Sequence, residues 1–289
     1  MRLVALAILF VMPLLAQSSG AKTAPPPPAS MQQMILPSHG SMLLGVFYLA
    51  AGNEPHPTAI LLHGFPGFEQ NLDLAQTMRE QGWNVLAMHY RGSWGVKGDF
   101  SFLHSAEDAD TQVRFVLDPV NVAKYRIDPH RVIVIGHSMG GYMAASAIAH
   151  NPEVAAAVLI SAWNIGTDYE YRLRSKSTTI ETEAAELSRN NNLLPLSGTT
   201  GQALATEIYE HKSELNFNNL APRISPRPVF VITANDGLLP VDHALTEALQ
   251  KAGDSHVRER HWDTDHSYSA QRAELAEAIL TWTKENLPK

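Results

Sequence analysis

Short apolar runs alternate with longer amphipathic stretches along most of the chain. The first two runs, at 33–36 and 43–50, flank a Pro-Ser-His-Gly turn and predict an antiparallel hairpin. Several later runs lack polar alternation, which is typical of strands covered on both faces. These predicted strands are residues 58–62, 84–89, 131–135, 155–160, 229–233 and 256–261.

Helical patterns fill the intervals between those runs and end at Gly, Asn or Pro signals. The alternation predicts an α/β fold in one domain, with a mainly parallel sheet and helices on both faces. Ligands of such sheets bind at the carboxyl ends of the strands. The predicted helices are residues 72–81, 105–117, 139–150, 241–252 and 269–286.

One interval, residues 164–226, contains no convincing strand. A bare loop of that length inside a compact domain is improbable, and 181–189 and 201–213 have helical patterning. We interpret the interval as a helical cap inserted over the strand ends. A helical decoration remote from any site is the alternative.

The N-terminus has the pattern of a secretory signal peptide, assigned to residues 1–21. Its apolar run, residues 3–15, is shorter than the about 20 residues that span a membrane. We therefore expect a secreted or periplasmic protein with no stable membrane anchor after cleavage. A Pro-rich linker over 22–32 then precedes an α/β domain at 33–289.

Composition narrows the function classes. The chain has 289 residues, a hydrophobic fraction of 45% and no cysteine, which excludes wholesale disorder, disulfides, thiol nucleophiles and a lipidated cysteine. With 22 basic and 29 acidic side chains, the net charge of −7 disfavours nucleic acid as a partner.

The strongest motif joins the run at 131–135 to the helix at 139–150. Gly136-His137-Ser138-Met139-Gly140 lies between them, the strand-turn-helix context of a nucleophile elbow. The glycines leave room for a strained turn that lifts Ser138 clear of the sheet. The helix start directs backbone N–H groups toward it.

The chain resembles the α/β-hydrolase superfamily, nearest to dienelactone hydrolases and prolyl-oligopeptidase-like serine hydrolases. The resemblance covers roughly residues 58–287 and implies the chain order Ser, acid, His. It depends on four motifs: His63-Gly64-Phe65-Pro66-Gly67, residues 136–141, Asn235-Asp236-Gly237 and Asp265-His266-Ser267.

A serine hydroxyl needs a base to remove its proton during attack. His266, between the last predicted strand and the C-terminal helix, occupies the position that the resemblance implies for the base of Ser138. His261 is the rival, although its place beside Trp262 favours packing. We interpret His63, His89, His137 and His243 as structural.

The acid that orients the base follows a late strand in this superfamily. Asp236 lies just beyond the run at 229–233 and is predicted to fill this role. Asp242 opens the next helix and is interpreted as a solvated first-turn carboxylate. Asp168 is the alternative acid.

Two backbone donors are expected to stabilise the oxyanion: the N–H of Met139, directly after the nucleophile, and, by resemblance, the N–H of Phe65. Trp94, Tyr142 and Trp163 follow strand ends or the elbow and are candidates for substrate binding, with packing as the alternative.

Other chemistries lack their motifs. No GxGxxG, GxxxxGK[ST] or HExxH pattern is present, so we expect no cofactor and no metal. The sequence predicts a serine hydrolase that cleaves small carboxylic esters through an acyl-enzyme. A peptidase of the prolyl-oligopeptidase-like type and a non-catalytic binding module on the same fold remain the alternatives.

Overall fold

A computed structural model describes residues 25–167 and 179–288. The predicted signal segment, the first residues of the linker and Asp168 lie outside the described residues. Within them, no helix combines the length and the apolar character needed to cross a membrane.

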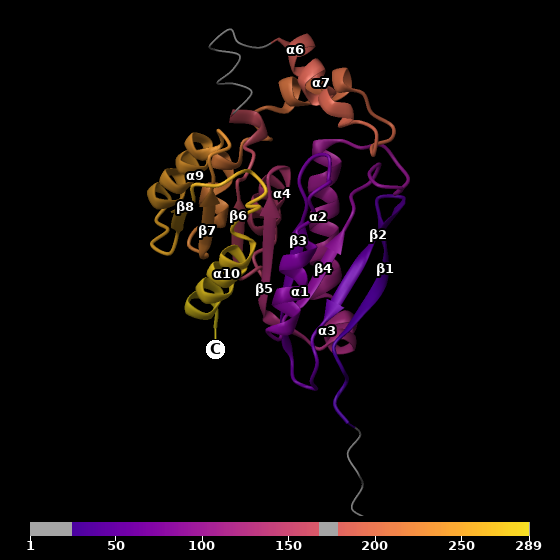
Figure 1. Ribbon diagram of the computed structural model, residues 1–289, viewed down its shortest axis with the longest axis vertical. Coiled ribbons are helices and arrows are strands. Elements are labelled where there is room, and N and C mark those ends of the chain that lie inside the picture. The colour runs from indigo at the N-terminus through magenta and orange to yellow at the C-terminus, as the bar shows by residue number, and fades with distance from the viewer. Residues whose placement is uncertain (1–24, 168–178, 289) are drawn as a thin grey trace, which may run out of the picture.

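The described chain forms one eight-stranded sheet in the order β1-β2-β4-β3-β5-β6-β7-β8 (Figure 1). β2 runs antiparallel to β1 and β4, and every pairing from β4 to β8 is parallel. The strands are β1 (Ser30–Ser38), β2 (Ser41–Leu49), β3 (His56–Leu62), β4 (Asn84–Met88), β5 (Ile127–His137), β6 (Ala156–Ile160), β7 (Val229–Thr233) and β8 (Arg258–His261).

Helices cover both faces of this sheet, so the predicted fold class is confirmed. One face packs against α1 and α10, and the other against α2, α4 and α9. The helices are α1 (Leu72–Glu80), α2 (Phe102–Leu117), α3 (Pro119–Tyr125), α4 (Met139–His150), α6 (Ile180–Leu187), α7 (Gly201–His211), α8 (Ala221–Ile224), α9 (Leu239–Lys251) and α10 (Arg272–Asn286), with 3-10 turns η1 (Arg189–Asn191) and η2 (Phe217–Leu220).

The central strands are apolar on both sides because each side meets a helical layer. On β5, Val132 and Val134 belong to the core beneath α2 and α4, whereas Ile133 and Ile135 belong to the core beneath α1 and α10. All four are fully buried. This double burial explains why the sequence shows a continuous apolar run there.

The N-terminal hairpin begins earlier than predicted. β1 starts at Ser30, within the segment assigned to the linker, because its ladder with β2 extends to the pair Ser30 and Leu49. The linker is also anchored, since the Gly52 N–H donates to the Pro27 carbonyl at 3.0 Å.

The insertion contains the helices that its patterning predicts. In Figure 1, α6 and α7 lie together beyond one end of the sheet. Residues 195–197 join this insertion to the loop after β4: the Trp94 N–H donates to the Pro195 carbonyl at 2.8 Å, and the Ser197 N–H to the Gly92 carbonyl at 2.8 Å. The insertion is therefore attached beside the carboxyl ends of the strands.

A buried ion pair connects the hairpin, the loop after β4 and α2. Asp108 of α2 is fully buried and accepts hydrogen bonds from the Ser38 hydroxyl at 2.6 Å and the Arg91 N–H at 2.7 Å. The Arg91 guanidinium, with a side chain 8% exposed, lies 2.8 Å from the same carboxylate. Its other carboxylate partner, Glu107, is 48% exposed.

We expect Asp108→Ala to lower the free energy of unfolding by about 3–5 kcal/mol, because it deprives the buried Arg91 charge of its buried partner and leaves only the exposed Glu107. The matched control is Glu107→Ala, which removes the exposed partner of the same guanidinium and should cost less than about 1 kcal/mol. Urea denaturation of both variants measures the difference. Equal losses would contradict the anchoring role of Asp108.

Candidate active site

Ser138 occupies a strained turn between β5 and α4. Its backbone has φ 57° and ψ −123°, a conformation that a residue with a Cβ rarely adopts. Contacts at the end of β6 maintain it: the Ser138 N–H donates to the Ile160 carbonyl at 2.9 Å, and the Trp163 N–H donates to the Ser138 carbonyl at 2.9 Å. The side chain is only partly buried, so the hydroxyl is presented at the carboxyl edge of the sheet.

The glycines around the elbow allow α4 to approach the sheet. A Cβ on Gly136 would lie 1.9 Å from the Gly140 carbonyl oxygen, and one on Gly140 would lie 2.0 Å from that of Leu62. A Cβ on Gly141 would lie 2.3 Å from the Ala162 Cβ. No side chain fits at these positions, so the close packing depends on glycine.

Asp236 and His266 meet beside this elbow. The His266 Nδ1 lies 2.8 Å from Asp236 Oδ2. An ionised carboxylate only accepts hydrogen bonds, so Nδ1 is the protonated nitrogen and Nε2 is left to act as a base. The Asp236 side chain is 5% exposed and that of His266 is 39% exposed. Thus the Asp236 carboxylate is shielded from solvent and the His266 imidazole is accessible to it.

The Asp236 carboxylate is stabilised by its surroundings. Burial opposes its ionisation, but hydrogen bonds with His266, with the Ser161 hydroxyl and with the Leu238 N–H outweigh this effect and lower its pKa. The Leu238 N–H donates to Asp236 Oδ1 at 3.0 Å. Asp236 therefore carries the negative charge that an orienting acid requires.

His137 connects the base to the elbow. Its Nε2 donates to the His266 carbonyl at 2.8 Å, and the two rings are 4.7 Å apart. Burial, reinforced by the nearby His266, lowers the pKa of His137 to about 4, so this imidazole stays neutral. It fixes the His266 loop next to Ser138. No hydrogen bond joins the Ser138 hydroxyl to His266 among the described contacts, and catalytic hydrogen bonds are often long before substrate binds.

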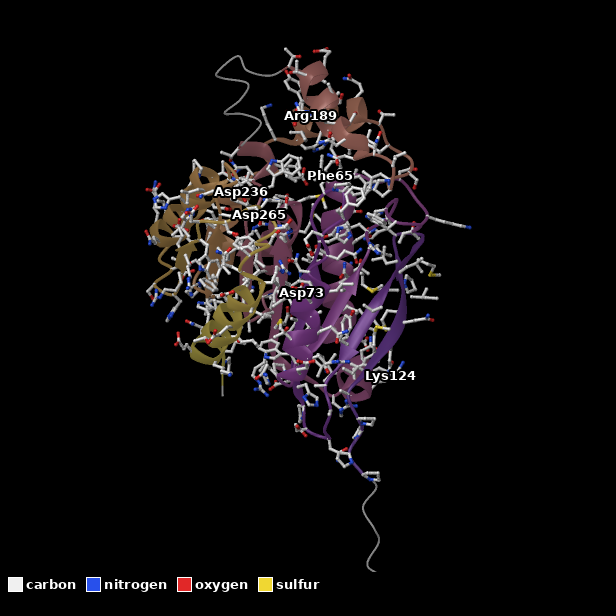
Figure 2. All side chains as sticks on the ribbon, viewed as in Figure 1. Phe65, Asp73, Lys124, Arg189, Asp236 and Asp265 are labelled. Carbon is white, nitrogen blue, oxygen red and sulfur yellow. The ribbon has the colours of Figure 1, made fainter. Side chains whose placement is uncertain are left out.

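The loop after β3 lies against the nucleophile. A Cβ on Gly64 would be 2.9 Å from the Ser138 Cβ and 3.4 Å from its Oγ. Phe65 follows directly, and Figure 2 shows it at the same end of the sheet as Asp236, beneath the insertion that carries Arg189. Met139 is the first helical residue of α4, so its N–H has no partner within the helix. Both predicted oxyanion donors thus flank Ser138.

Among the candidate substrate residues, Trp94 contacts this loop directly. Its Nε1 donates to the Pro66 carbonyl at 2.7 Å, and its ring packs edge-on against Phe68 with centroids 5.2 Å apart. Trp163 packs edge-on against Phe102 at 5.5 Å.

Tyr142, a candidate for substrate binding with packing as the alternative, is packed inside the protein. The residue is 3% exposed, and its hydroxyl donates to the Glu214 carbonyl at 2.9 Å. It borders a different cavity, of about 1030 Å³, between α2, α4 and the end of the insertion. The ring of Tyr142 belongs to the hydrophobic core, and its hydroxyl connects α4 to the insertion.

Asp242 also differs from its interpretation as a solvated carboxylate. It is fully buried in α9, and neither of its oxygens has a hydrogen-bond partner by distance and angle. Burial and the negative charge of Asp236 raise the pKa of Asp242 well above its ordinary value. The pattern of α9 placed Asp242 in the first turn but did not reveal which face turns inward.

The other candidate histidines have different partners. The His261 ring lies between the Thr233 hydroxyl at 2.9 Å and Asn235 Oδ1 at 3.0 Å, and no described hydrogen bond joins it to Asp236. His63 is buried in the oxyanion loop, where burial lowers its pKa to about 4. Within residues 25–167 and 179–288, no three histidine or carboxylate side chains gather in a metal-binding group.

A family comparison agrees with this geometry. The Hydrolase_4 family, described as serine aminopeptidase S33, matches residues 53–219, more than half of the 289-residue chain. The chain belongs to this family. The match includes the elbow and the loop around Phe65, and it ends before Asp236 and His266. The acid and base are therefore inferred from the geometry of this chain.

Solved structures share the α/β-hydrolase fold. The Pyrococcus furiosus esterase Pf2001 is 16% identical with a TM-score of 0.65, over 90% of this chain and 92% of its own. The carboxylesterase EstE1, cloned from a metagenomic library, is 19% identical with a TM-score of 0.63, over 92% of each chain. The Pyrococcus horikoshii acylaminoacyl peptidase is 17% identical with a TM-score of 0.65, over 91% of this chain and 42% of its own. Comparison with curated protein sequences gives no match.

Close packing at the elbow predicts a large stability loss for Gly136→Ala, by about 3 kcal/mol or more, because the added Cβ meets backbone. The control is Gly253→Ala. Gly253 has φ 94° and open space around it, so that substitution should cost only about 1 kcal/mol of backbone strain. Denaturant titration compares the two. Similar losses of stability in the two variants would contradict the predicted clash between the added Cβ and the backbone at the elbow.

The buried Asp242 predicts a pH-dependent stability. Its raised folded pKa means that the folded state holds the proton more tightly than the unfolded state. Stability is therefore lost as the pH rises from the ordinary value of 3.8 through the folded value. Asp242→Asn should remove this loss. The free energy of unfolding of this variant, relative to that of the wild type, should therefore grow by up to about 1.4 kcal/mol per pH unit in that window.

Unfolding free energies at pH 4, 6 and 8 test this expectation. Asp118→Asn, at an exposed helix cap, is the control for the same substitution without burial. An Asp242→Asn advantage that stays constant with pH would contradict the buried, protonated carboxyl.

Proposed function

We propose that this protein is a serine hydrolase that cleaves carboxylic esters through an acyl-enzyme. The observation that carries the proposal is the Asp236–His266 pair, with its 2.8 Å hydrogen bond, beside a strained Ser138. Family membership supports a serine hydrolase. The ester preference is the further step.

The reaction follows from the positions of these groups. Ser138 Oγ attacks the ester carbonyl carbon while His266 Nε2 accepts the hydroxyl proton, and Asp236 stabilises the resulting imidazolium. The carbonyl oxygen becomes an oxyanion that accepts hydrogen bonds from the Phe65 and Met139 N–H groups. His266 then protonates the leaving alcohol. Water, activated by the same histidine, attacks the acyl-enzyme and releases the acid.

An apolar cavity beside the oxyanion loop supports an ester with an apolar portion. It has a volume of about 660 Å³, and its lining includes Phe68, Trp94 and, from the insertion, Leu194. Phe68 is 65% exposed and Leu194 79% exposed, although both are large apolar side chains. Trp94 connects this apolar surface to the loop around Phe65 through its bond to the Pro66 carbonyl, and such a surface is suited to an uncharged ester group.

Peptide hydrolysis is the second candidate, favoured by the aminopeptidase description of the family and by the acylaminoacyl peptidase among the solved structures. This chain spans 42% of that peptidase. A matched panel of esters and amides with the same acyl groups separates the two activities. Faster turnover of the amides would replace the ester proposal with the peptidase.

We further propose export to the periplasm or the medium, supported by the signal-like pattern of residues 1–21. The intact mass of the protein exported by a host cell identifies the first residue of the mature chain. Retention of those residues in the exported protein would contradict cleavage.

A fluorophosphonate probe tests the nucleophile directly. We expect one adduct on the wild-type chain, none on Ser138→Ala, and a fall in ester turnover of at least about 10³-fold for that variant, because the attacking oxygen is lost. Ser146→Ala is the control. Ser146 lies on the same helix and is buried, and its loss should leave both labelling and turnover unchanged.

Intact mass spectrometry and initial rates measure these outcomes. Labelling of a folded Ser138→Ala variant would assign the reactivity to another residue. Absence of any adduct on folded wild type would favour a non-catalytic binding module.

A further inference from the structure

Two buried hydroxyl groups meet behind the acid and the base. The Ser161 Oγ and the Tyr268 hydroxyl are 2.9 Å apart, and both residues are completely buried. They are 107 positions apart in the chain. Neither belongs to the reaction scheme, so their contact requires another explanation.

Each residue stands next to a member of the triad. Ser161 follows β6 directly, and its N–H donates to the Ile232 carbonyl of β7, the strand that leads to Asp236, at 2.7 Å. Tyr268 follows His266 by two positions, and its N–H donates to the Asp265 carbonyl at 3.0 Å. The hydroxyl pair thus joins the acid side of the site to the loop of the base.

Both backbones are in the left-handed region, with φ 42° at Ser161 and φ 57° at Tyr268. Non-glycine residues pay for this conformation in backbone energy, so other contacts must maintain it. Ring packing contributes, since Tyr268 lies edge-on to Trp262 with centroids 5.8 Å apart. The turns direct the two hydroxyls toward each other.

The direction of the hydrogen bonds follows from the charges. Burial raises the pKa of Tyr268, so its phenol keeps its proton. The Ser161 hydroxyl lowers the pKa of Asp236, and a hydroxyl has this effect when it donates toward the ionised carboxylate. For Ser161 to donate there, the Tyr268 hydroxyl must donate to Ser161 Oγ. Asp242 is the other carboxyl near this network: its negative charge would raise the pKa of Tyr268, and its own pKa is raised by the charge of Asp236.

We propose that Ser161 and Tyr268 are positioning residues whose hydroxyl groups, donating in series toward Asp236, hold the acid and the His266 loop in register. This inference rests on the proposed function. The pair touches no substrate atom and acts through Asp236.

Tyr268→Phe and Ser161→Ala each remove one oxygen and preserve the larger packing. We expect each to lower kcat about 10-fold with KM within about twofold, because one donor to a charged group is lost or misdirected. The double variant should be no slower than Ser161→Ala alone. Tyr48→Phe is the matched control, a tyrosine of β2 that is 4% exposed, and should leave kcat unchanged.

The same substitutions in an Asp236→Asn background separate positioning from packing. If the pair acts through the carboxylate, Tyr268→Phe causes no further loss of kcat once Asp236 is neutral. A packing role lowers kcat by the same factor in both backgrounds. That result, or an unchanged kcat in the folded single variants, would overturn the proposal.

Proton NMR gives a readout that does not need turnover. The resonance of the His266 Nδ1 proton, identified by its loss in His266→Ala, should shift in Tyr268→Phe and Ser161→Ala and stay in place in Tyr48→Phe. An unmoved resonance would overturn the inference even in an inactive protein. Conversely, a shifted resonance with no Ser138-dependent hydrolysis would reject the ester proposal and retain the positioning pair.

Discussion

The close approach of α4 to the sheet is the constraint on which the site depends. It requires that no side chain stand between the helix and the ends of β3, β5 and β6, and three glycines satisfy this requirement. Once the helix is that near, the chain can pass from strand to helix only through one strained residue, Ser138. The same geometry brings the first N–H of the helix and the loop after β3 to the nucleophile.

Two carboxyl groups near the site show how local partners decide charge. Both are shielded from water, yet the pKa of Asp236 is lowered and that of Asp242 is raised. Asp236 has donors directed at it, including the imidazole of His266, whereas neither oxygen of Asp242 has a hydrogen-bond partner by distance and angle. Burial opposes ionisation of both acids; hydrogen-bond donors outweigh it at Asp236, whereas the negative charge of Asp236 reinforces it at Asp242.

Sequence patterns predicted the features that depend on local order. The helix at 139–150 and the strand at 229–233 were predicted with the bounds that the structure has, because apolar runs and turn residues delimit them. The short helix α3 was missed. It has a single buried residue, Tyr125, so it has no apolar stripe to recognise.

Features that depend on distant contacts were not predictable in this way. The hydroxyl pair of Ser161 and Tyr268 forms only when β6 and the last loop meet in space. The inward direction of Asp242 depends on how α9 rotates against the sheet, and Tyr142 turns toward the insertion because a carbonyl there accepts its hydroxyl. Residue type and spacing do not encode these pairings.

The double attachment of Trp94 has an evolutionary consequence. Its indole bonds the carbonyl of Pro66 in the oxyanion loop, and its backbone N–H bonds the carbonyl of Pro195 in the insertion. In a lineage that diversifies by remodelling the insertion, changes near Pro195 would be inherited together with altered freedom of the oxyanion loop. Under the proposed function, selectivity and rate would therefore not be independent traits, and selection on one would constrain the paths open to the other.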